Sequence, residues 1–294
     1  MRSPSRWNNS WVTSGVNFGS DHVQYVEPPR LAMAFTYPTS SLSAGWTRYV
    51  LEQMYGYPVT VVHTWQLASA DLSEYNVIIL PNAGGAFGGY SRLLGESGAQ
   101  KLRAWMQNGG TLITIGEATR WLTEEKVDLL ATAREFRGGK PEKKSEKKEG
   151  GASAKPESTA TGFDLQKNIQ PEEELPERTP GALLRVQLEN THWMTAGYNG
   201  YANVLVESSN IFTPLKLDKG VNLATYLPED RILLSGFTWA SAKKQLGNKA
   251  FLMQQQHGRG QVIAFAEDPN YRAFIDGLNL LFMNAVLLGP SHAR

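Results

Sequence analysis

The sequence predicts an α/β fold in which helices cover both faces of a mostly parallel sheet. Two observations predict it: short apolar segments alternate with segments of helical periodicity up to about residue 122, and strand-like segments dominate the region after Pro180. The early apolar segments lack polar alternation, which is typical of strands buried on both faces. Strands and helices that alternate in this way favour a parallel sheet with right-handed crossovers.

The first expected strand is LAMAF, residues 31–35. A helix should follow it, because apolar side chains recur at helical spacing at Leu42, Trp46, Tyr49, Val50 and Met54. Gly56 and Pro58 supply the stop signal. The first βα unit is therefore expected to end near residue 56.

Two further apolar segments, VTVV at 59–62 and NVIIL at 76–80, predict the second and third strands. Ser97 and Gln100 form a capping-box pattern that opens the helix AQKLRAWMQ, and Asn108-Gly109-Gly110 ends that helix. The next segment, TLITI at 111–115, predicts the fourth strand.

The second half of the domain is expected to be rich in strands. Its strand-like segments are ALLRVQL, NVLVES, RILLSGF, KAFLMQQ and QVIAFAED. The last two should form a hairpin, with Gly258 and Gly260 in its turn. Asp268-Pro269 should cap and open the final helix, whose expected apolar stripe is Phe274, Leu278, Leu281, Phe282, Ala285 and Leu288.

Two segments do not fit this pattern. Residues 138–180 contain few apolar side chains and mix both charges, so they are predicted to be a disordered insertion. Residues 1–30 are polar and end in Pro28-Pro29, which favours an N-terminal tail or the remnant of a linker. We therefore expect one domain over 31–290, interrupted by the insertion, in a chain that is a fragment of a longer protein.

The composition excludes several classes of function. A net charge of +1 with 19% charged residues argues against nucleic-acid binding, and no apolar run is long enough to span a membrane or to form a signal peptide. The absence of cysteine removes thiol chemistry. The five histidines lie far apart without HxxE or HExxH spacing, so no metal site is expected in this chain.

A binding crevice is expected where the carboxyl ends of the parallel strands meet. The loops that follow the strands would bring together Tyr37, Ser40, Ser41, Asn82, Gly84, Gly85, Glu117 and Arg120, with Trp46, Tyr90 and Trp121 as possible walls. The glycine-rich loop 84–89 lacks the spacing of a phosphate-binding loop, and it equally suits a tight crossover. The crevice is predicted to hold a small polar ligand.

The adjacent carboxylates Glu267 and Asp268 are the alternative candidates for chemistry. They follow the last strand-like segment and could act as acid and base, either together or with Glu117. Asp268 also precedes Pro269, so a helix cap is the competing explanation for it.

The segments from TLITI to QVIAFAED resemble the class I glutamine amidotransferase-like fold, a flavodoxin-like three-layer sandwich. Active members carry G-x-C-x-G at a strand-to-helix elbow and F-H-P-E after a later strand. Here Gly116-Glu117-Ala118-Thr119-Arg120 places Ala118 where the cysteine nucleophile would stand. Phe265-Ala266-Glu267-Asp268 likewise places Ala266 at the degenerate position of the histidine base. The resemblance therefore implies no catalytic residue of that type.

Longer phrases resemble the C-terminal amidotransferase-like domain of bacterial zinc carboxypeptidase-like metallopeptidases. They are SAGWTRYVLEQMYGYPV, IFTPLKLDKGVN, LLSGFTWA and GRGQVIAFAEDPNYRAF. This resemblance implies a covalently preceding peptidase domain upstream of Met1, which would hold the zinc, and a location outside the cytoplasm. No cofactor is implied for this chain itself.

The expected function is a non-catalytic accessory or binding domain of such a metallopeptidase-like protein. Two alternatives remain open. One is an autonomous hydrolase that uses Glu117 with Glu267 or Asp268, and the other is a structural domain that docks or dimerises through its strand-rich half.

Overall fold

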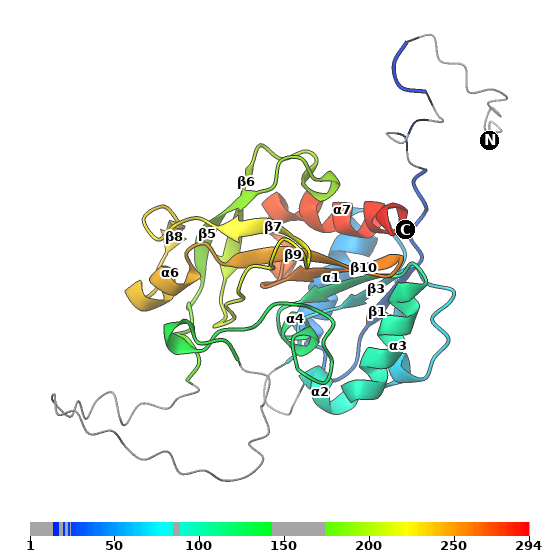
Figure 1. Ribbon diagram of the computed structural model, residues 1–294, viewed down its shortest axis with the longest axis horizontal. Helices are drawn as coiled ribbons and strands as arrows, with labels where there is room; N and C mark the ends of the chain where they lie inside the picture. Colours follow the sequence, from blue (N-terminus) through cyan, green and yellow to red (C-terminus); the bar gives the residue numbers. More distant parts are fainter. Residues whose placement is uncertain are drawn as a thin grey trace.

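The computed structural model describes residues 14–17, 20, 23, 25–84, 89–142 and 174–293, and these form an α/β sandwich around a large sheet (Figure 1). The sheet contains ten strands among the described residues, in the order β2-β1-β3-β4-β10-β9-β7-β5-β6, with β8 paired to β5. One hydrophobic core runs through both halves of the sheet, from Leu31 to Val286.

The first half of the sheet is parallel. It consists of β2 (Thr60–Val62), β1 (Leu31–Ala34), β3 (Val77–Leu80), β4 (Thr111–Ile115) and β10 (Gly260–Phe265). Every residue of β1, β3, β4 and β10 is buried, which is why these strands read as unbroken apolar runs.

The second half is antiparallel. It continues through β9 (Ala250–His257), β7 (Val221–Tyr226), β5 (Ala182–Leu188), β6 (Tyr201–Val206) and β8 (Leu233–Gly236). β9 and β10 form the expected hairpin, and Gly258 in its turn has φ 61°. The sequence missed β7, in which Leu223, Ala224 and Tyr226 are buried, and the short helix α6 (Ala240–Leu246).

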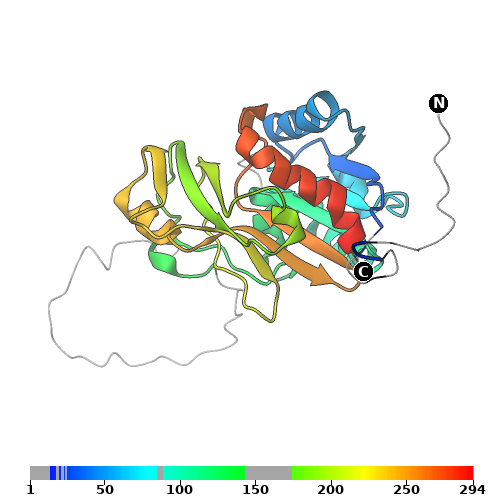
Figure 2. The same ribbon diagram turned by 90° about the horizontal axis from the view of Figure 1, so that it is seen from above.

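Helices cover both faces of the parallel half (Figures 1 and 2). On one face lie α7 (Asp276–His292) and α1 (Ser41–Tyr49), which continues as a π-helical turn over Val50–Met54. On the other lie α2 (Gly89–Leu93), α3 (Gly95–Gln107) and α4 (Glu117–Leu122). Short 3₁₀ turns occur at Thr64–Ala68, Arg137–Gly139, Trp193–Thr195 and Tyr271–Ala273.

Two helix starts differ from the sequence prediction. α3 begins at Gly95, so Ser97 lies inside its first turn and donates its hydroxyl to the Leu94 carbonyl instead of capping. The final helix begins at Asp276 and not at Pro269, because Arg272 and Ala273 adopt left-handed φ values of 51° and 52° that interrupt it.

This later start changes which side chains of the final helix are buried. Phe274 lies before α7 and is 58% exposed, whereas Phe282 is fully buried and packs on Phe265 with a ring-centroid distance of 6.4 Å. Leu278, Leu281 and Ala285 are buried as expected, and Leu288 is only partly buried.

The predicted N-terminal tail and the predicted insertion belong only in part to the described residues. Residues 143–173, the bulk of the predicted insertion 138–180, lie outside the described residues. At their base the Arg137 amide donates to the Glu174 carbonyl at 2.7 Å. At the end of the predicted tail 1–30, the Glu27 amide donates to Ser291 at 2.8 Å and the Arg30 amide donates to Asn76 at 2.6 Å. The chain thus enters β1 along the amino edge of the sheet.

Two kinds of feature are absent from the described residues. Within them no helix is both long enough and apolar enough to cross a lipid bilayer. The same part of the chain contains no group of three or more histidine, aspartate or glutamate side chains placed to hold a metal ion.

Candidate functional site

The carboxyl ends of β3, β4 and β10 meet at one edge of the sheet, and a cavity of about 450 Å³ opens there. Part of its wall comes from the turns after these strands, and part from the segment that follows β6. The lining residues are Asn82, Gly116, Glu117, Arg178, Leu205, Glu207, Ser208, Ser209, Asn210, Ala266, Glu267, Asp268 and Tyr271. Most of them are polar or charged.

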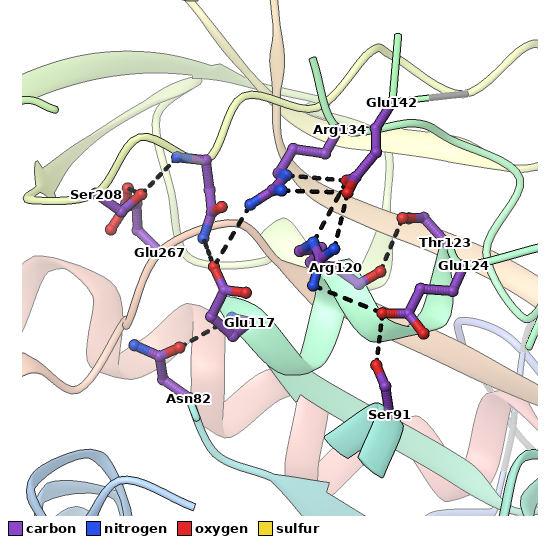
Figure 3. Close-up of polar contacts among 11 residues, drawn as sticks. Asn82, Ser91, Glu117, Arg120, Thr123, Glu124, Arg134, Glu142, Ser208 and Glu267 are labelled. Atoms are coloured by element: carbon purple, nitrogen blue, oxygen red, sulfur yellow. Dashed lines mark hydrogen bonds and ion pairs between the residues drawn. The ribbon is translucent and has the colours of Figure 1, made fainter. Parts of the chain in front are cut away.

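The turn after β4 is built on Gly116. Its φ of 57° and ψ of −115° suit a residue without a side chain. A Cβ atom at this position would lie 2.5 Å from Asn82 Oδ1, so the Asn82 side chain occupies the space that a nucleophile would need. Asn82 Oδ1 in turn accepts a hydrogen bond of 2.9 Å from the Glu117 amide (Figure 3). Asn82 therefore stabilises the turn between β4 and α4 by this hydrogen bond.

The two degenerate positions assigned from the amidotransferase motif fall in different surroundings. Ala118 lies on α4 and is completely buried, so it does not face the cavity, and the sharp turn belongs to Gly116 two residues earlier. Ala266, which follows β10, does line the cavity. The residue at the tip of the elbow, Gly116, has no side chain, and Ala266 after β10 has only a methyl group.

Glu117 reaches the cavity from the start of α4. Its Oε1 accepts a hydrogen bond from Asn210 Nδ2 at 2.9 Å and lies 4.0 Å from Arg134 Nη1 (Figure 3). Asn210 itself is 5% exposed, and its Oδ1 has no donor among the described residues. A buried acceptor without a partner is costly, and this atom has almost no accessible surface in the free protein.

Glu267 is the most deeply buried carboxyl group of the cavity, at 4% exposure. Burial raises its pKa to about 8, although the hydrogen bond of 2.5 Å that Ser208 donates to Oε1 acts in the opposite direction. The Ser208 hydroxyl also accepts a hydrogen bond from the Asn210 amide at 2.9 Å. At neutral pH Glu267 is therefore mainly protonated.

Burial also raises the pKa of Asp268, to about 6. Its Oδ2 accepts a hydrogen bond of 2.5 Å from Ser43, and its Oδ1 accepts one of 2.9 Å from the Asn270 amide. The Ser43 hydroxyl in turn accepts from the Asn82 amide at 3.1 Å. Asp268 thus connects the ends of β10 and β3 to helix α1, and it caps a tight turn at Asn270 instead of a helix.

Behind Glu117 lies a cluster of ion pairs (Figure 3). Glu142 accepts hydrogen bonds from Arg134 at 3.0 and 3.2 Å and from Arg120 at 2.8 and 3.3 Å. Burial alone would raise the pKa of Glu142, but the hydrogen bonds and charges of the two arginines outweigh it and lower the pKa. Arg120 also lies 3.5 Å from Glu124. Both arginines are therefore neutralised mainly by Glu142 and Glu124.

Of the eight residues predicted to form the crevice, the structure places Asn82 and Glu117 on the large cavity. Arg120 and Glu117 line a separate cavity of about 90 Å³ together with Tyr90 and Trp121, which are both almost fully buried. Gly85 lies outside the described residues.

The remaining predicted residues form the neighbouring loop. Ser40 caps α1 through the Ser43 amide, Ser41 is the exposed first residue of α1, and Tyr37 is 48% exposed. The Gly84 amide donates to the Pro38 carbonyl at 2.8 Å. Trp46 stands behind the cavity, because its ring packs 4.7 Å from that of Tyr271.

The sequence prediction missed the residues after β6. Glu207, Ser208 and Asn210 follow β6, which β9, β7 and β5 separate from β10 in the sheet. The segment nevertheless reaches the end of β10, where Ser208 donates to Glu267. The polar run ESSN after an apolar strand was a signal, but the sequence alone does not indicate which edge of the sheet it reaches.

Comparison with known proteins supports the fold. No protein-family model and no curated protein sequence matches the chain. A solved structure described as a ThuA-like protein from Parabacteroides merdae is similar to it with a TM-score of 0.52 and 12% identity, over 90% of each chain. One described as a GMP synthase subunit, from Thermoplasma acidophilum, gives a TM-score of 0.50 and 8% identity, over 87% of this chain and 92% of the other.

A glutamine amidotransferase from Thermotoga maritima overlaps less well, with a TM-score of 0.45 and 10% identity over 82% of this chain and 75% of the other. The first two similarities confirm the expected fold class, a flavodoxin-like α/β sandwich with a mostly parallel sheet, which the ThuA-like and GMP synthase subunit structures share.

Proposed function

We propose that this chain is a non-catalytic binding domain with an amidotransferase-like fold, which holds a small polar ligand in the cavity beside Gly116. The pair Gly116 and Asn82 carries the proposal, because glycine provides no nucleophile and the Asn82 side chain fills the space that one would need. A cavity of about 450 Å³ is within the size range of small-molecule sites. The proposed site is thus a cavity at the carboxyl edge of the sheet, beside an elbow that has no nucleophile.

The lining of the cavity also contains buried polar groups that lower the stability of the fold, which supports a binding function for the cavity. Glu267 and Asn210 are nine-tenths or more buried, and Asn210 Oδ1 has no hydrogen-bond partner among the described residues. Buried polar groups of this kind destabilise a protein unless something pairs with them. A bound polar molecule would supply the missing partners.

We further propose that the domain serves as an accessory to a covalently preceding zinc carboxypeptidase-like domain. The long phrases noted in the sequence support this proposal, and so does the geometry of the chain. Residues 27–30 enter along the amino edge of the sheet, and the cavity opens at the carboxyl edge. A domain joined at residue 27 would therefore leave the cavity accessible.

Two experiments test these proposals. Ligand-observed NMR with a library of small polar compounds should find binders that lose affinity in Glu117→Gln and keep it in Asp218→Asn, an exposed acid outside the cavity. Mass spectrometry should then recover each binder unchanged after long incubation, and a converted product would contradict the binding function. For the accessory role, the coding sequence upstream of Met1 should encode a zinc carboxypeptidase-like domain in frame, and a stop codon there would contradict it.

A second candidate function is hydrolysis by Glu117 with Glu267 or Asp268. The observation in its favour is that all three line one cavity and that Glu267, with a pKa of about 8, holds a proton at neutral pH. Both oxygens of Asp268, however, accept hydrogen bonds from Ser43 and Asn270. A turnover that is lost in Glu267→Gln and falls as pH rises through 8 would favour this candidate.

The third possibility, a docking or dimerisation domain, has one supporting observation in the strand-rich half. Phe237 and Trp239, between β8 and α6, are 53% and 50% exposed, and their rings lie 4.9 Å apart. Light scattering on the wild type and on Phe237→Ser would detect self-association at this place.

A further inference from the structure

We infer that the cavity beside Gly116 binds a small organic cation, an ammonium or guanidinium compound, and that the protein releases a proton when the cation binds. This inference rests on the proposed binding function and adds the chemical class of the ligand. It follows from the charges that line the cavity, from its unpaired acceptor and from the buried Glu267.

The charges of the lining are unbalanced. Four acidic residues line the cavity, namely Glu117, Glu207, Glu267 and Asp268, of which Glu267 is mainly protonated at neutral pH. Arg178 is the one lining residue among those described that carries a positive charge. Arg178 is exposed, and its Nε donates to the backbone carbonyl of Glu207 at 2.6 Å. The lining therefore favours a positively charged ligand over a neutral or anionic one.

The nearby arginines do not correct this imbalance. Arg134 gives both its hydrogen bonds to Glu142 and approaches Glu117 only to 4.0 Å. Arg120 pairs with Glu142 and Glu124 outside the cavity. Neither arginine is a lining residue of the cavity.

The unpaired acceptor indicates what the ligand must donate. Asn210 lines the cavity and is 5% exposed, and its Nδ2 already donates to Glu117, which lines the same cavity. Its Oδ1 has no donor within the described part of the chain and almost no accessible surface in the free protein. A ligand that turns this side chain toward the cavity can satisfy the atom only with an N–H or O–H, and an ammonium or guanidinium group provides several such donors.

The carboxylates suit an organic cation better than a metal ion. Glu267 accepts a hydrogen bond from Ser208, and Asp268 accepts two from Ser43 and Asn270, so part of each group is already occupied. No three acidic or histidine side chains of the described residues come together as metal ligands. A hydrogen-bond donor can share such carboxylates without displacing their present partners.

The proton comes from Glu267. Its pKa of about 8 leaves it mainly neutral at pH 7, and the groups facing it are Ser208, Glu207 and the buried Tyr226 hydroxyl, with Glu117, Asp268, Tyr271 and Arg178 on the same cavity. A cation beside Glu267 favours the carboxylate, so the proton passes to the buffer when the cation binds. Glu207 acts in the opposite direction in the free protein, because its charge raises the pKa of both Glu267 and Asp268.

The expected pH dependence follows from the ionised fraction of Glu267. With a pKa of about 8, that fraction is about 0.01 at pH 6 and about 0.5 at pH 8. If the cation binds the carboxylate form, its apparent affinity rises about 50-fold between these two pH values. The affinity levels off above the pKa.

Isothermal titration calorimetry with three probes of equal chain length tests the inference. Putrescine carries two ammonium groups, 1,4-butanediol is its neutral counterpart and succinate is its anionic counterpart. We expect putrescine to bind, to bind about 50-fold more tightly at pH 8 than at pH 6, and to release up to about one proton at pH 7 in buffers of different ionisation enthalpy. Glu267→Gln should weaken binding and remove most of the pH dependence, while Asp218→Asn should match the wild type.

Several outcomes would overturn the inference. If butanediol or succinate binds at the cavity and putrescine does not, the charge argument fails and the binding function stands. If putrescine binds with no change between pH 6 and 8, the role of Glu267 fails. Competition by Mg²⁺ would indicate a metal site instead, and absence of heat with every probe at millimolar concentration would also contradict the inference. Circular dichroism of each variant excludes misfolding as the cause.

Discussion

Replacing Gly116 by alanine tests whether the turn between β4 and α4 can carry any side chain. The backbone there has φ 57° and ψ −115°, a conformation that costs a residue with a Cβ about 1–3 kcal/mol. The new Cβ would also lie 2.5 Å from Asn82 Oδ1, so the asparagine must move and lose its hydrogen bond from the Glu117 amide. That loss costs about 1 kcal/mol.

A smaller effect acts in the opposite direction. Alanine restricts the unfolded chain and so stabilises by about 0.4–1 kcal/mol wherever its backbone is unstrained. The net expectation is that Gly116→Ala lowers the free energy of unfolding by about 1–3 kcal/mol. Gly45→Ala is the matched control, because a Cβ at this helical position on α1 would meet nothing within 4 Å. It should be neutral or stabilising.

Urea denaturation followed by circular dichroism measures these differences. The double variant Asn82→Ala with Gly116→Ala should lose less stability than the sum of the single variants, because removal of the amide relieves the clash. The reasoning is refuted if Gly116→Ala is as stable as the wild type, or if the two substitutions are additive within about 0.3 kcal/mol.

Four further predictions concern the core and the buried charges. Glu267 has a pKa of about 8 in the folded state and its ordinary pKa of 4.5 in the unfolded chain, so its contribution to stability is complete below pH 4.5 and is lost as pH rises to 8. Between pH 5 and pH 8 the free energy of unfolding of Glu267→Gln should therefore rise relative to that of the wild type, by at most about 1.4 kcal/mol per pH unit in denaturation experiments. Tyr226→Phe should be neutral or stabilise by about 1 kcal/mol in urea denaturation, because it removes a buried hydroxyl that has no partner among the described residues. Phe282→Ala should cost about 3–5 kcal/mol by the same assay and Phe274→Ala at most about 0.5, and equal costs would contradict the late start of α7. Glu142→Gln should cost about 1–3 kcal/mol at pH 7 by leaving Arg134 without its charged partner, and this difference should disappear as pH falls through the lowered pKa of Glu142.

The parallel half of the fold could be predicted because burial leaves a local signal. Strands β1, β3 and β4 are buried over their whole length, and each reads as an apolar run between turn residues. β7 was missed because only half of its residues are buried and because it is placed by pairing with β9 and β5, which are distant in the sequence. The start of α7 was misplaced because Asp268-Pro269 has the local features of a helix start, while the backbone of Arg272 and Ala273 ends that turn.

Only the wall of the candidate site that follows the parallel strands could be predicted from the sequence. Asn82, Glu117, Glu267 and Asp268 follow strands whose direction the periodicity indicates, so their meeting at one edge could be expected. The opposite wall comes from the segment after β6, a strand that three others separate from β10, and no local pattern shows that this segment reaches the end of β10.

The motif also did not identify the residue at which the elbow turns. The motif placed the nucleophile position at Ala118, whereas the left-handed residue of the elbow is Gly116, immediately after the last residue of β4. Because a left-handed φ is a property of the backbone, the spacing of residue types around a glycine does not show which residue adopts it.

The central claim is that the cavity at the carboxyl edge binds a ligand and leaves it chemically unchanged. A two-dimensional amide NMR titration with putrescine, observed together with the signals of the ligand, tests this claim most directly. We expect shifts confined to residues 116–117, 207–210 and 266–268, and ligand signals that keep their identity over days. New product signals, or shifts centred on β8 and α6 instead, would contradict it.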